Sequence, residues 1–132
     1  MEGVHVSDHL MEETASAAVE KGAMMLDTLH PGWFVDINPD DVIMGKYGHD
    51  VLAHLHGTTY HGMATLGITE DKAIEGGFKI HHEELSRRFA TAWRRNIRHM
   101  IHVAVHNDHT VTWRRAISKR QQLHMDNKLL LG

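Results

Sequence analysis

The feature that most constrains this chain is the regular spacing of apolar residues in its second half. Between residues 85 and 104 they recur every three or four positions, which is the period of one face of an α-helix. The residues of this stripe are Leu85, Phe89, Ala92, Trp93, Ile97, Met100, Ile101 and Ala104. The pattern predicts a long helix that begins near His82 and is broken at Asn107-Asp108. After the break, Thr110 is placed to cap a last helix.

A second stripe predicts a helix near the N-terminus. It ends before Pro31, because the residue that precedes a proline resists helical geometry. Its residues follow a 4-3-4-3-4 spacing and are Met11, Ala15, Ala18, Gly22, Met25 and Leu29. Three of these six residues are small. Such a seam either lets another helix approach closely or marks a poorly filled face.

Glycines divide the middle of the chain into short segments. Gly57, Gly67 and Gly76-Gly77 each follow a short helical pattern, as expected where a helix ends. We therefore predict an all-α fold, in which two longer helices pack with several short helices bounded by glycine. One helical domain spans residues 1–132, and residues 110–132 form its basic C-terminal extension. The expected core residues are Trp33, Phe34, Leu52, Leu55, Phe78, Phe89 and Trp93.

One competing pattern remains at the end of the long stripe. β-Branched residues are frequent on both sides of Asn107-Asp108, and a two-residue turn of this type can join two strands. The alternative fold is therefore α+β, with a C-terminal hairpin at residues 101–114. The unbroken helical spacing from Leu85 to Ala104 favours the helical interpretation.

Composition excludes several classes of protein. The chain has no cysteine, which excludes disulfides, Cys-ligated zinc, iron–sulfur clusters and cysteine nucleophiles. No apolar run approaches the ~18 residues of a membrane span, and the first residues lack the apolar stretch of a signal peptide. Phosphate-binding loops, dinucleotide-binding glycine motifs and nucleophile elbows are also missing. We expect an intracellular protein that is not an enzyme, with no catalytic residues, no cofactor and no membrane partner.

Charge is divided unevenly along the chain. Residues 1–78 carry thirteen acidic and three basic side chains, whereas residues 79–132 carry four acidic and eleven basic ones. In an asymmetry of this size, the opposite charges either neutralise each other within the fold or the basic part attracts an acidic partner.

Part of the positive charge is predicted to lie along the outer face and flank of the long helix, beside several histidines. Guanidinium groups offer paired donors to carboxylate and phosphate groups, and a basic strip binds nucleic acid largely through counterion release. The same composition is also ordinary for a solvated helix face. The candidate binding residues are Arg88, Arg94, Arg95, Arg98, His99, His102 and His106. Their predicted partner is a host protein or a second copy of the chain, with nucleic acid as the alternative.

Histidine is frequent enough to raise a metal site as a second alternative. His102 and His106 have the i, i+4 spacing that places two imidazoles on one helix face, and His5 and His9 share this spacing. A protein metal site needs at least a third ligand, and the sequence does not show these pairs converging with one. His54, His56 and His61 cluster near a glycine-rich bend and are the candidates to supply it. The sequence also lacks a His-Glu-x-x-His motif. We therefore expect no bound metal.

Several short motifs occur in a fixed order along the chain. They are His30-Pro31-Gly32-Trp33, Val51-Leu52-Ala53-His54-Leu55-His56-Gly57, Gly62-Met63-Ala64-Thr65-Leu66-Gly67-Ile68, Gly77-Phe78 and Ala92-Trp93-Arg94-Arg95-Asn96-Ile97. In this order they resemble a family of small accessory proteins with no assigned activity, encoded by tailed bacteriophages of actinobacteria.

The resemblance covers about residues 22–98 and implies a virus-encoded accessory protein that works in the host cytoplasm. Members of the family often carry a Cys-x-x-Cys motif just before the Val-Leu pair. This chain has Tyr47 and Asp50 at those positions, so a metal or redox role of that motif is not available to it.

Overall fold

The computed structural model describes the backbone of residues 8–80 and 97–131, and the side chains of residues 15–80 and 103–130. These residues contain no strand, which confirms the predicted all-α fold. The elements are α1 (Asp8–Leu29), the 3₁₀ turn η2 (Pro39–Asp41), α2 (Val51–His56), α3 (Thr59–Leu66), α4 (Glu70–Glu75) and α6 (Ile97–Leu131). As predicted, two helices are much longer than the rest: α1 has 22 residues and α6 has 35.

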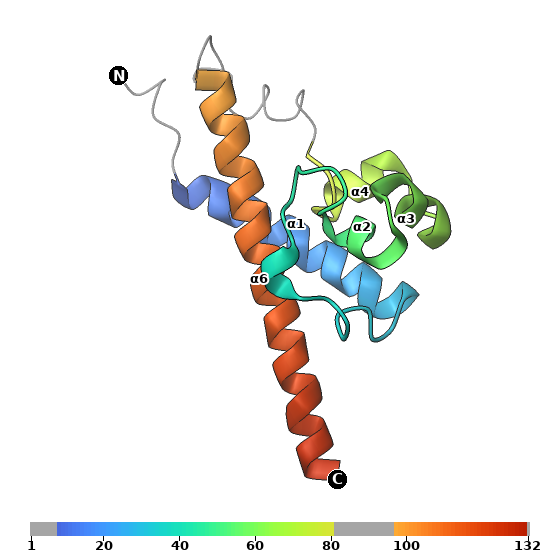
Figure 1. Ribbon diagram of the computed structural model, residues 1–132. Coiled ribbons are helices and arrows are strands. Elements are labelled where there is room, and N and C mark those ends of the chain that lie inside the picture. The colour runs from blue at the N-terminus through green and yellow to red at the C-terminus, as the bar shows by residue number, and fades with distance from the viewer. Residues whose placement is uncertain (1–7, 81–96, 132) are drawn as a thin grey trace.

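The two long helices cross, and the short helices gather on one side of α1 (Figure 1). The C-terminal end of α6 extends past the other elements of the described structure. Among the described helices, none combines the length and the apolar character needed to cross a membrane.

The centre of α6 differs from the sequence-based prediction. The helix continues through Asn107 and Asp108, so the predicted break there and the alternative hairpin at residues 101–114 are both wrong. Asn and Asp disfavour a helix by at most ~0.7 kcal/mol each relative to Ala, whereas burying a large apolar side chain contributes roughly 1.5–3 kcal/mol. Burial of Trp113 on the next turns of this helix therefore outweighs the local preference. The predicted helix start near His82 lies outside the described residues.

The buried face of α1 is shifted relative to the predicted stripe. Gly22 is buried as predicted, but Leu29 is exposed. Val19 and Leu26 are almost fully buried although the stripe omits them. The physical reason is that both α6 and α4 pack against α1, so the helix buries a wider arc than a single stripe. At Gly22, a Cβ atom would lie 1.9 Å from the carbonyl oxygen of Gly76, which confirms the close approach that small residues allow.

Trp113 of α6 lies at the centre of the core. Its side chain is fully buried, and its indole Nε1 donates a hydrogen bond to the carbonyl oxygen of Gly77 at 2.8 Å. Its ring stacks on Phe78 with centroids 5.1 Å apart and meets the edge of Trp33 at 5.9 Å. Three segments distant in sequence are therefore joined by one aromatic cluster.

The predicted core is largely confirmed where it can be seen. Three of its residues are buried: Trp33, Leu52 and Phe78. Two are half-buried and pack against the edge of the core: Phe34 and Leu55. Two lie outside the described residues: Phe89 and Trp93.

Two polar side chains of α6 hold the loop that follows α1. Arg114 donates from Nε to the carbonyl oxygen of Val42 at 3.0 Å. Gln121 donates from Nε2 to the carbonyl oxygens of Phe34 at 2.9 Å and Ile37 at 2.6 Å. Buried loop carbonyls need such donors, because an unpaired one costs about 1–3 kcal/mol. The loop and α1 are thus fixed to α6 as one unit.

The opposite charges of the two parts of the sequence partly neutralise each other within this unit. α1 carries five acidic residues and one lysine, whereas α6 carries six basic and two acidic residues, so their net charges are −4 and +4. These oppositely charged helices pack against each other. The Asp27–Arg120 ion pair joins them, so the first of the two alternatives accounts for part of the asymmetry.

Candidate functional site

The predicted binding strip is only partly within the described structure. Arg88, Arg94 and Arg95 lie outside it, and Arg98, His99 and His102 occupy the first turns of α6, where side chains are not described. The strip as a whole stays a prediction.

His106 is the member of the strip whose side chain is described, and it does not lie on an open outer face. It is half-buried and lines a small pocket beside residues 44–47. A Cβ atom at Gly45 would lie 2.3 Å from Nδ1 of His106, so only a glycine fits against this ring. Helical spacing predicts an outer face at His106, because spacing within one helix does not place the loop that covers this residue.

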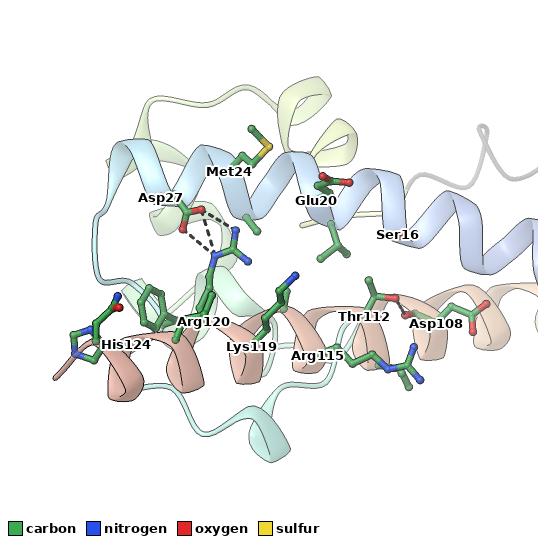
Figure 2. A pocket seen from close by; sticks show the side chains of 17 residues that line it. Ser16, Glu20, Met24, Asp27, Asp108, Thr112, Arg115, Lys119, Arg120 and His124 are labelled. Carbon is green, nitrogen blue, oxygen red and sulfur yellow. Dashed lines mark hydrogen bonds and ion pairs between the residues drawn. The ribbon is translucent and has the colours of Figure 1, made fainter. Parts of the chain in front are cut away.

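A larger hollow lies between α1 and α6 (Figure 2). This groove has a volume of about 1080 Å³. α1 contributes Ser16, Val19, Glu20, Ala23, Met24 and Asp27. α6 contributes Asp108, Val111, Thr112, Arg115, Ala116, Lys119, Arg120, Leu123, His124 and Asn127, and Phe34 comes from the loop after α1. We call this hollow the α1–α6 groove.

Two small side chains line the α1–α6 groove where the helices approach each other. Ala23 of α1 is buried in the core, and Ala116 of α6 is half-buried and packs against the core. Larger apolar side chains line the groove and remain exposed, namely Met24, Val111 and Leu123. The lining is therefore partly apolar and open to solvent. The small-residue seam predicted on α1 allows a close approach at Gly22, but none of its six residues lines the groove.

An ion pair bridges the two walls of the groove near the C-terminal end of α1. Arg120 donates from Nε to Oδ1 of Asp27 at 3.0 Å and from Nη2 to Oδ2 at 2.7 Å. These bonds hold the pKa of Asp27 below its usual value, and a hydrogen bond from the indole of Trp33 at 2.9 Å acts in the same direction. The guanidinium also lies 5.9 Å from the Trp33 ring. This pair fixes the spacing of α1 and α6 at that end.

Three further charges along the groove are not paired in this way. Figure 2 shows Glu20 projecting from α1, and Arg115 and Lys119 projecting from α6. Within residues 15–80 and 103–130, none of the three forms a hydrogen bond or an ion pair. The groove therefore has an acidic wall, a basic wall and an apolar floor. The sequence did not predict these charged walls, because their arrangement depends on which faces of two distant helices meet.

A histidine cluster lies away from the groove. The ring of His56 in α2 is 5.4 Å from that of His30 and 6.3 Å from that of His61. Among the residues that the structure describes, no three His, Asp or Glu side chains are arranged to hold a metal ion. Burial lowers the pKa of His56, and the neighbouring His30 and His61 lower it further. Burial also lowers the pKa of His109 in α6, against the opposing effect of its hydrogen bond to the carbonyl oxygen of Val105.

These shifts predict a loss of stability in mild acid. Below pH 6.5, the usual pKa of an imidazole, the unfolded chain binds protons that folded His56 and His109 resist, so the free energy of unfolding falls. Urea unfolding at about pH 7.5 and about pH 5.5 measures this loss in a range where most carboxylates stay ionised. His56→Gln is expected to reduce the difference between the two pH values. His54→Gln, an exposed change on the same helix, is the control, and an equal effect of both would contradict the assignment.

Comparison of the chain with protein-family models, curated proteins and solved structures found no match. The geometry of the α1–α6 groove is therefore the main support for a function.

Proposed function

We propose that this protein is a non-enzymatic binding module whose α1–α6 groove receives an amphipathic helix of a protein partner. The observation that carries this proposal is the open groove of about 1080 Å³, with a floor of small residues between two walls of opposite charge. Helix-in-groove recognition uses an apolar stripe that enters such a floor and flanking charges that fix its orientation.

The dimensions of the groove suit a helix. Its lining on α6 runs from Asp108 to Asn127, which corresponds to a length of about 30 Å along the axis. A partner helix of about five turns would lie along α6 and pass over the Asp27–Arg120 pair, with a large apolar side chain beside the half-buried Ala116. Glu20 on one wall and Lys119 on the other would each meet a residue of opposite charge.

The opposite charges of the α1 wall and the α6 wall argue against nucleic acid as the occupant of this groove. A phosphate backbone would meet Arg115 and Lys119 favourably but would be repelled by Glu20 of the facing helix, a carboxylate without an ion pair in the described part of the chain. The resemblance to accessory proteins of actinobacterial bacteriophages supports an accessory role in the host cytoplasm.

Selection of helical peptides tests the proposal. A displayed library of amphipathic helices, with leucine at i, i+3 and i+7 and varied charges, is expected to yield binders to the wild-type protein. Ala116→Arg on the floor and Lys119→Glu on the wall are each expected to weaken these binders by about tenfold or more. Ser118→Arg is the matched control, because Ser118 is exposed on the same helix and does not line the groove. Circular dichroism confirms that each variant remains helical.

Two results would overturn the proposal. One is a library that yields no binder to the folded wild-type protein. The other is a set of binders whose affinity is equal for Lys119→Glu and Ser118→Arg, since these peptides would then bind elsewhere.

A further inference from the structure

The C-terminal end of α6 exposes more apolar surface than a solvated helix requires. Leu123, Leu129 and Leu130 are 53%, 79% and 83% exposed, and Met125 is also exposed. Figure 1 shows this end of α6 extending past the rest of the described structure. Leu123 and Leu130 lie on one side of the helix, and Met125 and Leu129 lie on the opposite side. Exposed apolar side chains that share one face of a helix can mark a surface that contacts another molecule.

This end continues the face of α6 that lines the groove. Ala116, Leu123 and Leu130 are seven residues apart, and that interval returns a helix to nearly the same face. Ala116 and Leu123 both line the α1–α6 groove. One α6 helix therefore carries a small side chain in the groove, Ala116, and about four turns later a large exposed one on the same face, Leu130.

We propose that the helix received by the α1–α6 groove is the Leu123–Leu130 end of α6 from a second copy of the chain. The inference rests on the proposed function and names its partner. The two copies form a two-fold dimer in which their α6 helices run antiparallel, with Leu123 of each copy at the axis. Each groove is occupied by the other copy along residues 116–123 of α6, which face residues 123–130 in this register, and the same contact occurs twice, as a closed two-fold interface requires.

The residues along α6 are complementary in this register. In an antiparallel pair centred on Leu123, residues at equal distances from Leu123 face each other. A residue seven positions before Leu123 in one helix faces the residue seven positions after Leu123 in the other helix. Ala116 then faces Leu130 of the second copy, so a small side chain opposes a large one. Arg120 faces Asp126 of the second copy by the same rule.

The electrostatics of the groove fit this occupant. Arg120 uses Nε and Nη2 toward Asp27, which leaves Nη1 for a second carboxylate. Lys119, adjacent in sequence, has no hydrogen bond or ion pair within residues 15–80 and 103–130. Asp126 of the second copy would therefore enter a site with two cationic side chains. Away from the overlap at Leu123, the two folded bodies lie toward opposite ends of the paired helices.

Disulfide trapping tests the register directly, because the chain has no cysteine of its own. Leu123→Cys places one thiol from each copy at the axis and is expected to give a covalent dimer on mild oxidation. Leu130→Cys is expected to give no covalent dimer under the same conditions. In the proposed register the two thiols are fourteen residues apart along the helices, or about 21 Å. Tyr47→Cys, an exposed position outside the α1–α6 groove, is the control for random collisions.

Sedimentation of the wild-type protein provides the second measurement. A concentration-dependent dimer is expected, with roughly micromolar affinity for an interface of this limited size. Leu130→Glu and Asp126→Arg are each expected to weaken it by about tenfold or more, whereas Tyr47→Glu leaves it unchanged.

Each other outcome overturns the inference in a recognisable way. Cross-linking of both Leu123→Cys and Leu130→Cys indicates a parallel pair, and cross-linking of neither, with a wild-type monomer at all concentrations, excludes the dimer. In the latter case helical peptides that bind the groove would still support the proposed function, so the two failures are distinguishable.

Discussion

Trp113→Ala is expected to lower the free energy of unfolding by about 3–5 kcal/mol, the range for removing a fully buried tryptophan. The ring is 0% exposed and contacts Phe78 and Trp33, so its loss leaves a cavity where three segments meet. The buried carbonyl of Gly77 also loses its donor. Urea unfolding followed by circular dichroism measures the change, and a variant that is unfolded without denaturant meets the expectation.

Two further variants divide this effect into its parts. Trp113→Phe keeps an aromatic ring but loses the hydrogen bond to Gly77, so an intermediate loss of about 1–3 kcal/mol is expected. Val111→Ala shortens an exposed side chain of the same helix and is expected to change stability by about 0.5 kcal/mol or less. A Trp113→Ala loss as small as that of Val111→Ala would contradict the central position of this tryptophan.

Gly22→Val is expected to destabilise the fold by roughly 3 kcal/mol, at the upper end of the usual cost of overpacking. The added Cβ would lie 1.9 Å from the carbonyl oxygen of Gly76 and 3.0 Å from the ring of Trp113. Neither neighbour is the free end of a flexible side chain, so α1 and the end of α4 must separate. Thermal and urea unfolding report the loss.

The control for Gly22→Val is the same residue at an exposed position of the same helix. Ala17→Val adds a β-branched side chain to α1 in solvent, where the cost is limited to helix propensity, about 0.7 kcal/mol at most. If both variants lose the same stability, the close packing of α1 against α4 is not as described.

The fold class was predictable because helical spacing is a local property of the sequence. The two long helices and the buried Trp33, Leu52 and Phe78 follow from it. The wrongly predicted helix break at Asn107-Asp108 has a non-local cause. Local preference favours a break there, but the decisive energy comes from burying Trp113 against residues far away in sequence, which spacing alone does not reveal.

The candidate site was less predictable than the fold. Arg115 and Lys119 were recognised as part of a basic segment, yet nothing in the spacing placed Glu20 on the facing wall. A groove exists only where two helices meet at particular faces, and the shift of the α1 stripe toward Val19 and Leu26 changes those faces. His106 shows the same limit, since its burial depends on a loop with a glycine at position 45.

The unbroken course of α6 has a mechanical consequence. A continuous helix of 35 residues is about 52 Å long and resists bending, so its first and last turns keep a fixed separation and a fixed rotational phase. A molecule bound at one end of α6 therefore keeps a fixed orientation relative to a molecule bound at the other end. The distance between spectroscopic probes attached near residues 103 and 130 is expected to stay constant when the protein binds a ligand.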